Sequence, residues 1–204
     1  MQHVLETPVN EFRDPDNDIV PLLFRRWSPR AMSGETVTDD DLEKLFEAAR
    51  WAPSSYNGQP WRFVYAKRDS SHWRDFFALL GEFNQEWASS GAVLVIVLSR
   101  TTFEHNGKPA RTHSFDTGAA WQNLALQGRR MDLVVHGMAG FDYQAAADLL
   151  QLPDDFEVEA MVVIGRPAKA EVLDDELQEK EAPSDRKPVS EIAFEGRLPH
   201  PDSG

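Results

Sequence analysis

The stretch Ala-Pro-Ser-Ser-Tyr-Asn-Gly-Gln-Pro-Trp at residues 52–61 contains residue types suited to binding a flat polar ligand. Its two prolines restrict the backbone, while the polar side chains and backbone groups between them offer hydrogen-bond partners. The same composition is typical of an ordinary connection between a helix and a strand, so the loop by itself leaves both interpretations open. The candidate ligand contacts in this loop are Pro53, Ser54, Ser55, Asn57 and Gln59.

A second candidate site is the run Arg-Arg-Trp-Ser-Pro-Arg at residues 25–30. Guanidinium groups match phosphate oxygens in bidentate geometry, so these arginines and the neighbouring hydroxyl form a plausible phosphate cradle. The alternative is a solvated basic turn, or a set of salt bridges within an acidic protein. The residues concerned are Arg25, Arg26, Ser28 and Arg30.

A third stretch, His-Gly-Met-Ala-Gly-Phe-Asp at residues 136–142, combines glycines with small residues. Glycine lets a backbone amide approach a ligand without side-chain obstruction. His136 is a candidate ligand contact or proton source because imidazole titrates near neutrality, and a structural histidine bonded to the backbone is the alternative. Asn84 is another candidate contact, although a lone asparagine is commonly a capping or turn residue.

The composition limits the kinds of function that the chain can have. Its 204 residues, 41% of them hydrophobic, are enough for one sizeable core and predict one domain. The chain lacks cysteine, so redox chemistry here would require an organic cofactor. The formal charge of −13 disfavours nucleic acid and anionic membranes as partners. The polar N-terminus and short apolar runs show no signal peptide or membrane span, which predicts a cytoplasmic protein.

Hydrophobic spacing and capping residues predict the elements that position these candidates. Thr38 fits an N-cap and Asp41 the capping-box position of a helix that ends before Pro53. The alternation of residues 61–66 predicts a strand, and the apolar run Ala92 to Leu98 predicts a central strand buried on both faces. Further along we expect a helix from Ser114 or Asp116 to Arg130, a strand over 133–135, a helix from Asp142 to Leu150, a strand over 158–164 and an extended tail over 167–204.

These three motifs, in their order along the chain, resemble the nitroreductase family of flavin-dependent oxidoreductases. The matching elements are Arg-Arg-x-Ser-x-Arg, Ala-Pro-Ser-Ser-x-Asn-x-Gln-Pro-Trp and Gly-Phe-Asp, and the resemblance covers nearly the whole chain. It implies one α+β domain over 1–204, with an N-terminal arm over 1–20 and a mixed, mainly antiparallel sheet flanked by helices. It also implies an intertwined homodimer with flavin mononucleotide (FMN) at the interface.

The resemblance further implies a role for each motif. Arg26, Ser28 and Arg30 would hold the flavin phosphate, with Arg186 joining them from the tail. The loop at 53–57 would line the ring system from the other subunit, and Met138, Ala139 and Gly140 would lie along the ring with a backbone amide near its redox-active nitrogen. NADH or NADPH would reduce the flavin, which would then reduce a nitroaromatic, a quinone or a similar small-molecule acceptor in a ping-pong mechanism. No catalytic side chain and no metal site is predicted.

Two residues depart from the family pattern, so the substrate pocket is expected to differ from those of the well-known nitro-reducing members. Ala139 stands where some members have glutamate, and Met32 where an aromatic residue is frequent. The alternative functions are a non-catalytic flavin-binding protein on the same scaffold, or a specialised member that performs dehalogenation or flavin cleavage. A different class of protein, an acidic interaction module, is suggested only by the acidic tail from Glu171 onward.

Overall fold

The computed structural model describes residues 9–199 and is built around one four-stranded sheet. The strands are β1 (Trp61–Lys67), β2 (Val93–Arg100), β3 (Val134–Met138) and β4 (Phe156–Gly165), in the spatial order β1-β2-β4-β3. All three pairings between them are antiparallel. The expected α+β class, with mainly antiparallel pairing, is therefore confirmed.

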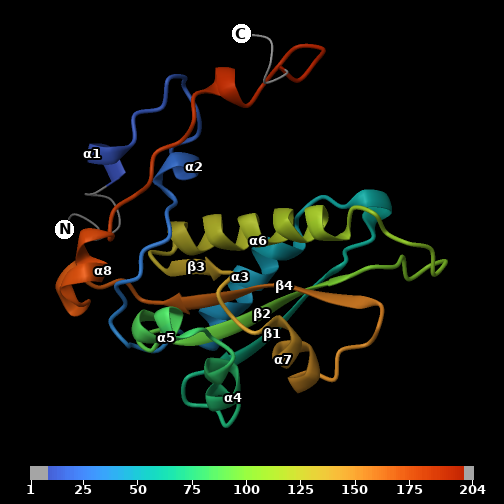
Figure 1. Cartoon of the computed structure of the whole chain (residues 1–204), viewed down its shortest axis with the longest axis horizontal. Helices are drawn as coiled ribbons and strands as arrows, with labels where there is room; N and C mark the ends of the chain where they lie inside the picture. Colours follow the sequence, from blue (N-terminus) through green and yellow to red (C-terminus); the bar gives the residue numbers. More distant parts are fainter. Residues whose placement is uncertain (1–8, 200–204) are drawn as a thin grey trace.

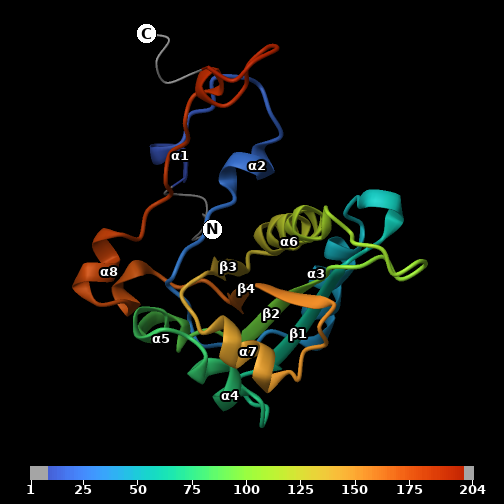
Figure 2. The ribbon, with the colours of Figure 1, turned by 45° about the vertical axis from the view of Figure 1, so that its right-hand side comes forward.

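Helices cover both faces of the sheet (Figures 1 and 2). α3 (Asp39–Arg50) and α6 (His113–Arg130) lie on one face, and α4 (Trp73–Ala78), α5 (Glu82–Ala88) and α7 (Tyr143–Leu149) on the other. Each face has its own cluster of buried apolar side chains. Every residue from Val93 to Leu98 is at most 4% exposed, as expected of a central strand that contacts both layers.

The helix boundaries follow the capping residues that the sequence indicated. The Thr38 hydroxyl accepts the Asp41 backbone N–H at 3.1 Å, and Asp142 accepts the Ala145 N–H at 2.9 Å. The carboxylate of Asp41 forms an ion pair with Arg166 at 3.0 Å. This contact joins the start of α3 to the end of β4.

Two expectations about the elements need correction. β3 extends through Met138, so His136 and Gly137 lie in a strand paired with β4 and not in a loop after the strand. The tail beyond residue 167 is not simply extended, because it contains the short helical segments η2 (Ala170–Val172), α8 (Asp175–Glu179) and η3 (Val189–Glu191). Leu177 of α8 is 3% exposed, and its burial on the body explains why this part of the tail folds back.

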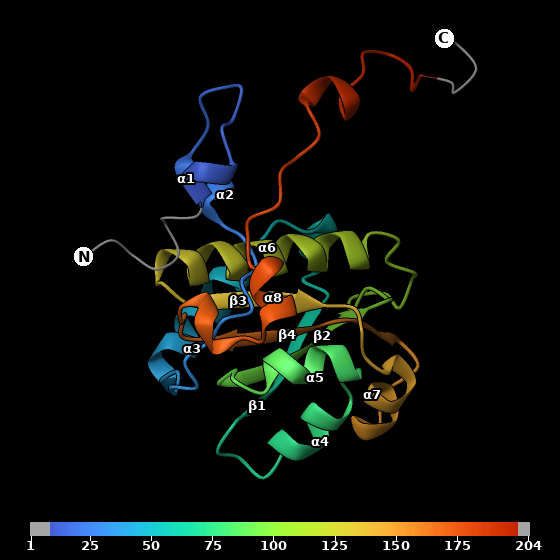
Figure 3. The same cartoon turned by 60° about the vertical axis from the view of Figure 1, so that its left-hand side comes forward.

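The N-terminal segment and the end of the tail both rise from the α6 side of the body (Figure 3). The N-terminal segment contains α1 (Val9–Phe12) and α2 (Pro21–Arg25). Several large apolar side chains on these two projections are exposed, at 47% for Leu23, 66% for Ile192 and 42% for Phe194. Within the described residues, no helix is both long and apolar enough to cross a membrane.

Candidate functional site

Arginines from three separate parts of the chain lie close together. Arg26 follows α2, Arg13 follows α1 and Arg186 comes from the tail. Burial lowers the pKa of Arg26, and the positive charge of Arg186 lowers it further. The pKa of Arg13 is lowered by burial and then by the charges of Arg186 and Arg26, with Asp185 acting in the opposite direction. The three guanidinium groups are therefore close enough to repel one another.

The hydrogen bonds of this cluster leave its positive charge largely uncompensated. Arg26 Nη1 donates to Ser28 Oγ at 3.2 Å, and Arg186 Nη1 donates to Ser184 Oγ at 3.0 Å. Arg13 donates to the backbone carbonyl oxygens of Phe24, Arg26 and Ser184, which ties the N-terminal segment to the tail. Within residues 9–199, none of these three arginines forms an ion pair with a carboxylate. In a protein of net charge −13, such a group is a natural anion site.

Arg30 lies next to this cluster and is held by the tail. Glu181 Oε1 accepts the backbone N–H groups of Arg30 and Ala31 at 2.7 and 2.8 Å, and its other oxygen lies 3.9 Å from Arg30 Nη1. Burial raises the pKa of Glu181, and the two backbone hydrogen bonds and Arg30 oppose that shift. Arg30 Nε is buried without a hydrogen-bond partner, so the guanidinium retains a donor for a ligand.

His136 of β3 faces the same region. Its Nδ1 lies 2.9 Å from the backbone oxygen of Pro29, and its ring packs on Trp87 with centroids 4.5 Å apart. Burial lowers its pKa to about 4, and the charges of Arg30 and Arg26 act in the same direction. The imidazole is therefore neutral at physiological pH. This environment favours the structural interpretation of His136 over the proton-source interpretation.

The backbone after β3 lies close to α5. Asn84 Nδ2 donates to the carbonyl oxygen of Gly140 at 2.9 Å, and a Cβ on Gly140 would lie 2.9 Å from that nitrogen. Ala139 and Gly140 are exposed, whereas the Met138 side chain is only 4% exposed and belongs to the core. Ala139 and Gly140 therefore offer backbone groups to a ligand. Met138 can do so only through its main chain.

The loop at 53–59 has an unusual backbone conformation. Tyr56, Asn57 and Gln59 have φ values of 51°, 53° and 45°, in the left-handed region that side chains other than those of Asn and Asp seldom adopt. The Ser54 hydroxyl accepts the Gln59 N–H at 3.1 Å, and the buried Asp116 accepts the Ser55 N–H at 3.0 Å. Such strain persists only when surrounding contacts hold it, and it is concentrated at functional sites.

An open pocket of about 620 Å³ lies against this loop. The Tyr56 ring is 85% exposed and meets Phe103 edge-on, with centroids 5.7 Å apart. The size is within the range of pockets that bind small organic molecules. The lining residues are Tyr56, Asn57, Gly58, Gln59, Arg62, Glu104 and His105.

Within one chain, the loop and the arginine cluster lie at opposite ends of α6. Asp116 in its first turn holds Ser55, and Arg129 near its last residue donates to the carbonyl oxygen of Arg25 at 3.2 Å. Arg129 is 13 positions after Asp116, which corresponds to about 20 Å at 1.5 Å per residue. Figure 1 shows α2 near one end of α6 and the segment that follows α3 near the other.

The structure thus divides the predicted site residues into two groups. One group contains Arg25, Arg26, Ser28, Arg30, Asn84, His136, Met138, Ala139, Gly140 and Arg186. The other contains Pro53, Ser54, Ser55, Asn57 and Gln59. The first group supplies guanidinium and hydroxyl donors that suit a phosphate, and the second supplies polar groups beside a pocket.

Three supporting residues were not predicted from the sequence. Arg13 lies in the N-terminal arm, Asp116 was considered only as a helix start, and Glu181 was one acid among many in the tail. An acidic residue in the first turn of a helix is a general signal for capping, but it does not reveal that Asp116 binds a distant backbone N–H. The partners of Arg13 and Glu181 depend on tertiary contacts.

Comparisons with known proteins identify the family of this chain. The family model described as "Nitroreductase family" matches residues 23–86 and 70–166. A solved oxidoreductase described as containing FMN is 46% identical, covers 92% of this chain and 96% of its own, and has a TM-score of 0.88. Protein DrgA of Synechocystis is 27% identical over 179 residues, which is 73% of this chain and 84% of the relative. The major NAD(P)H-flavin oxidoreductase of Aliivibrio fischeri is 32% identical over 81 residues, which is 39% of this chain and 37% of the relative.

The low pKa of His136 predicts how stability depends on pH. The folded-state pKa of about 4 lies below the ordinary value of 6.5, so the unfolded chain takes up a proton first as the pH falls. The contribution of His136 to the free energy of unfolding is therefore complete above about pH 6.5. It is lost as the pH falls toward 4, by at most about 3 kcal/mol. We expect His136→Asn, which can keep a donor near Pro29 but does not titrate, to lose less stability than wild type over this range.

Histidine-selective NMR titration measures the pKa directly, and denaturant unfolding at several pH values measures the stability difference. The experiment should use phosphate-free buffer, because a bound anion would raise the pKa of His136. An imidazole that titrates at its ordinary value, with parallel stability curves for the two proteins, would contradict the burial described above.

Proposed function

Because the chain belongs to the nitroreductase family, we propose that it is an FMN-dependent oxidoreductase. It takes reducing equivalents from NADH or NADPH and passes them to a small-molecule acceptor such as a nitroaromatic compound or a quinone. FMN is supported by the FMN-containing structure that is 46% identical, and the nicotinamide donor by the name of the Aliivibrio fischeri relative. When bound, FMN supplies two-electron chemistry.

The observation that carries the proposal is the positive cluster around Arg26, in which Arg26 and Arg186 form no ion pair within residues 9–199. Together with Arg30, which is paired with Glu181 but keeps a free Nε–H, and the Ser28 hydroxyl, they provide charged and neutral donors for a terminal phosphate. An anion there would offset both the burial and the charge of Arg186, which together lower the pKa of Arg26. The neutral His136 next to them adds no further positive charge to the cradle.

The other residues orient the ring and shape the space in front of it. Backbone groups of Ala139 and Gly140 are exposed, and Asn84 fixes the Gly140 carbonyl through its hydrogen bond. The loop at 54–59 is held in place by Asp116 and presents Asn57 and Gln59 to the pocket. Transfer of a hydride requires alignment of donor and acceptor over the ring, which such positioning provides without a dedicated acid or base.

We propose that two chains combine to form each site. One chain holds its arginine cluster and its 54–59 loop about 20 Å apart along α6, so the loop that completes a site comes from the second copy. A two-fold dimer then has two equivalent sites. The exposed apolar side chains Leu23, Ile192 and Phe194 on the two projections are suited to contact that second copy.

Removal of the arginines is expected to weaken binding of FMN more than that of riboflavin. Arg26→Gln and Arg186→Gln each remove charge-assisted hydrogen bonds to a phosphate, so the FMN dissociation constant should rise by about tenfold or more. Riboflavin lacks the phosphate and should bind all variants with similar affinity. Arg74→Gln is the matched control, because Arg74 is an exposed arginine of α4. Quenching of flavin fluorescence measures both constants, and equal losses for the two flavins would contradict the phosphate role.

Anaerobic addition of NADH and then NADPH to the flavin-loaded protein tests the oxidoreductase activity. The visible flavin absorption should disappear with at least one donor and return when an acceptor such as a quinone is added. Flavin that binds but stays oxidised with both donors would contradict the enzymatic proposal and favour a flavin-binding protein.

A further inference from the structure

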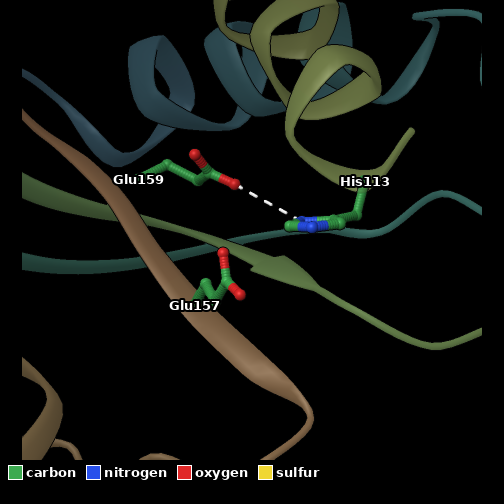
Figure 4. A group of neighbouring side chains, drawn as sticks. All are labelled: His113, Glu157 and Glu159. Carbon is green, nitrogen blue, oxygen red and sulfur yellow. Dashed lines mark ion pairs between the residues drawn. The ribbon is translucent and has the colours of Figure 1, made fainter. Parts of the chain in front are cut away.

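A histidine and two glutamates form a compact group on the α6 face of the sheet. His113 begins α6, and Glu157 and Glu159 lie in β4. One potential ligand atom from each residue lies within 4.8 Å of the others. Figure 4 shows the Glu159 side chain pointing toward the imidazole, with Glu157 on the same side of β4.

A β-bulge explains how two residues of β4 reach the same imidazole. Val97 pairs with Ala160 and Leu98 pairs with Val158, so Glu159 is an extra residue in β4. Glu157 pairs with Ser99 and lies on the same face of the sheet as Ser99 and Val97. Without the bulge, regular alternation along β4 would place Glu157 and Ala160 on opposite faces. The bulge therefore brings both carboxylates to the α6 side.

Hydroxyl groups hold one of the carboxylates in position. Ser99 Oγ donates to Glu159 Oε1 at 2.5 Å, and Ser114 Oγ donates to Glu159 Oε2 at 2.7 Å. Ser99 Oγ also lies 2.7 Å from His113 Nδ1. Hydrogen bonds of this kind orient the ligands of metal ions in proteins.

Among the residues that the structure describes, no lysine or arginine compensates the charge of the two glutamates. Over residues 9–199, neither Glu157 nor Glu159 forms an ion pair with a lysine or arginine, and the Glu157 carboxylate has no hydrogen-bond partner. His113 Nδ1 lies 3.6 Å from Glu159 Oε1, with exposed side-chain fractions of 18% and 22%. Two carboxylates held together without a cation repel each other unless an ion joins them.

We propose that His113, Glu157 and Glu159 bind a divalent transition-metal cation such as Zn²⁺. One imidazole nitrogen and two carboxylate oxygens form a three-residue ligand set that leaves a position for water. Imidazole favours Zn²⁺ over Mg²⁺, which prefers oxygen ligands only. The ion would link β4 to the first turn of α6, one turn from the Asp116 carboxylate that holds the candidate ring-binding loop. This site is separate from the arginine cluster and does not depend on the flavin proposal.

Calorimetric titration of the tag-free 204-residue chain with Zn²⁺ after chelator treatment tests the site, with or without bound flavin. We expect one Zn²⁺ per chain, a higher melting temperature with Zn²⁺, and no comparable response to Mg²⁺. Glu157→Gln and His113→Asn should each weaken Zn²⁺ binding by about tenfold or more. Glu157 is exposed and unpaired, so its replacement should leave the fold and the flavin spectrum intact.

Glu171→Gln is the matched control, since Glu171 is an exposed glutamate of η2 outside the group, and it should bind Zn²⁺ as wild type does. Absence of stoichiometric Zn²⁺ binding by the wild type would overturn the proposal. Equal affinity of Glu157→Gln and wild type would also overturn it, because the ion would then bind elsewhere.

Discussion

Repulsion between guanidinium groups is the interaction on which this account depends. Arg13, Arg26 and Arg186 are brought together by the N-terminal segment and the tail, and burial together with mutual repulsion lowers the pKa of Arg26. An acidic chain has many carboxylates that could neutralise them, yet no ion pair within the described residues does so. The proposed ligand is a phosphate, because its oxygens match guanidinium donors in charge and geometry. The backbone contacts of Arg13 and Glu181 then act as supports that hold the cradle in shape.

The length of α6 imposes the second constraint. The helix fixes the distance between Arg25, which contacts its last turn, and Ser55, which contacts its first. A rigid 18-residue helix cannot shorten to bring the two groups together. The strained backbone at Tyr56 and Gln59 and the pocket beside it therefore lie far from the chain's own arginine cluster. In the proposed dimer, the loop of a second copy would lie beside each arginine cluster, which makes dimerisation part of the proposed chemistry.

Local sequence signals predicted much of the fold. Thr38 and Asp142 cap the helices that they were expected to cap, and the apolar run beginning at Ala92 contains the buried part of β2. The boundary of β3 was wrong because pairing with β4 overrides the glycine at 137. The metal-site candidate was not predicted, since a bulge and a distant helix start bring His113 to Glu159. Signals within a few residues predict local structure, whereas contacts such as Asp116 with Ser55 arise only from tertiary packing.

Complementation between two defective chains tests the shared site most directly. Arg26→Gln damages the phosphate cradle, and Asn57→Gly removes a loop side chain while accommodating the left-handed backbone. Dimers that contain one chain of each variant can be isolated with two different affinity tags. If each site takes its cradle from one chain and its loop from the other, one of the two sites is wild type, and about half of the FMN-dependent NADH or NADPH oxidation should return. Mixed dimers with no more activity than the average of the two parent variants would contradict the account.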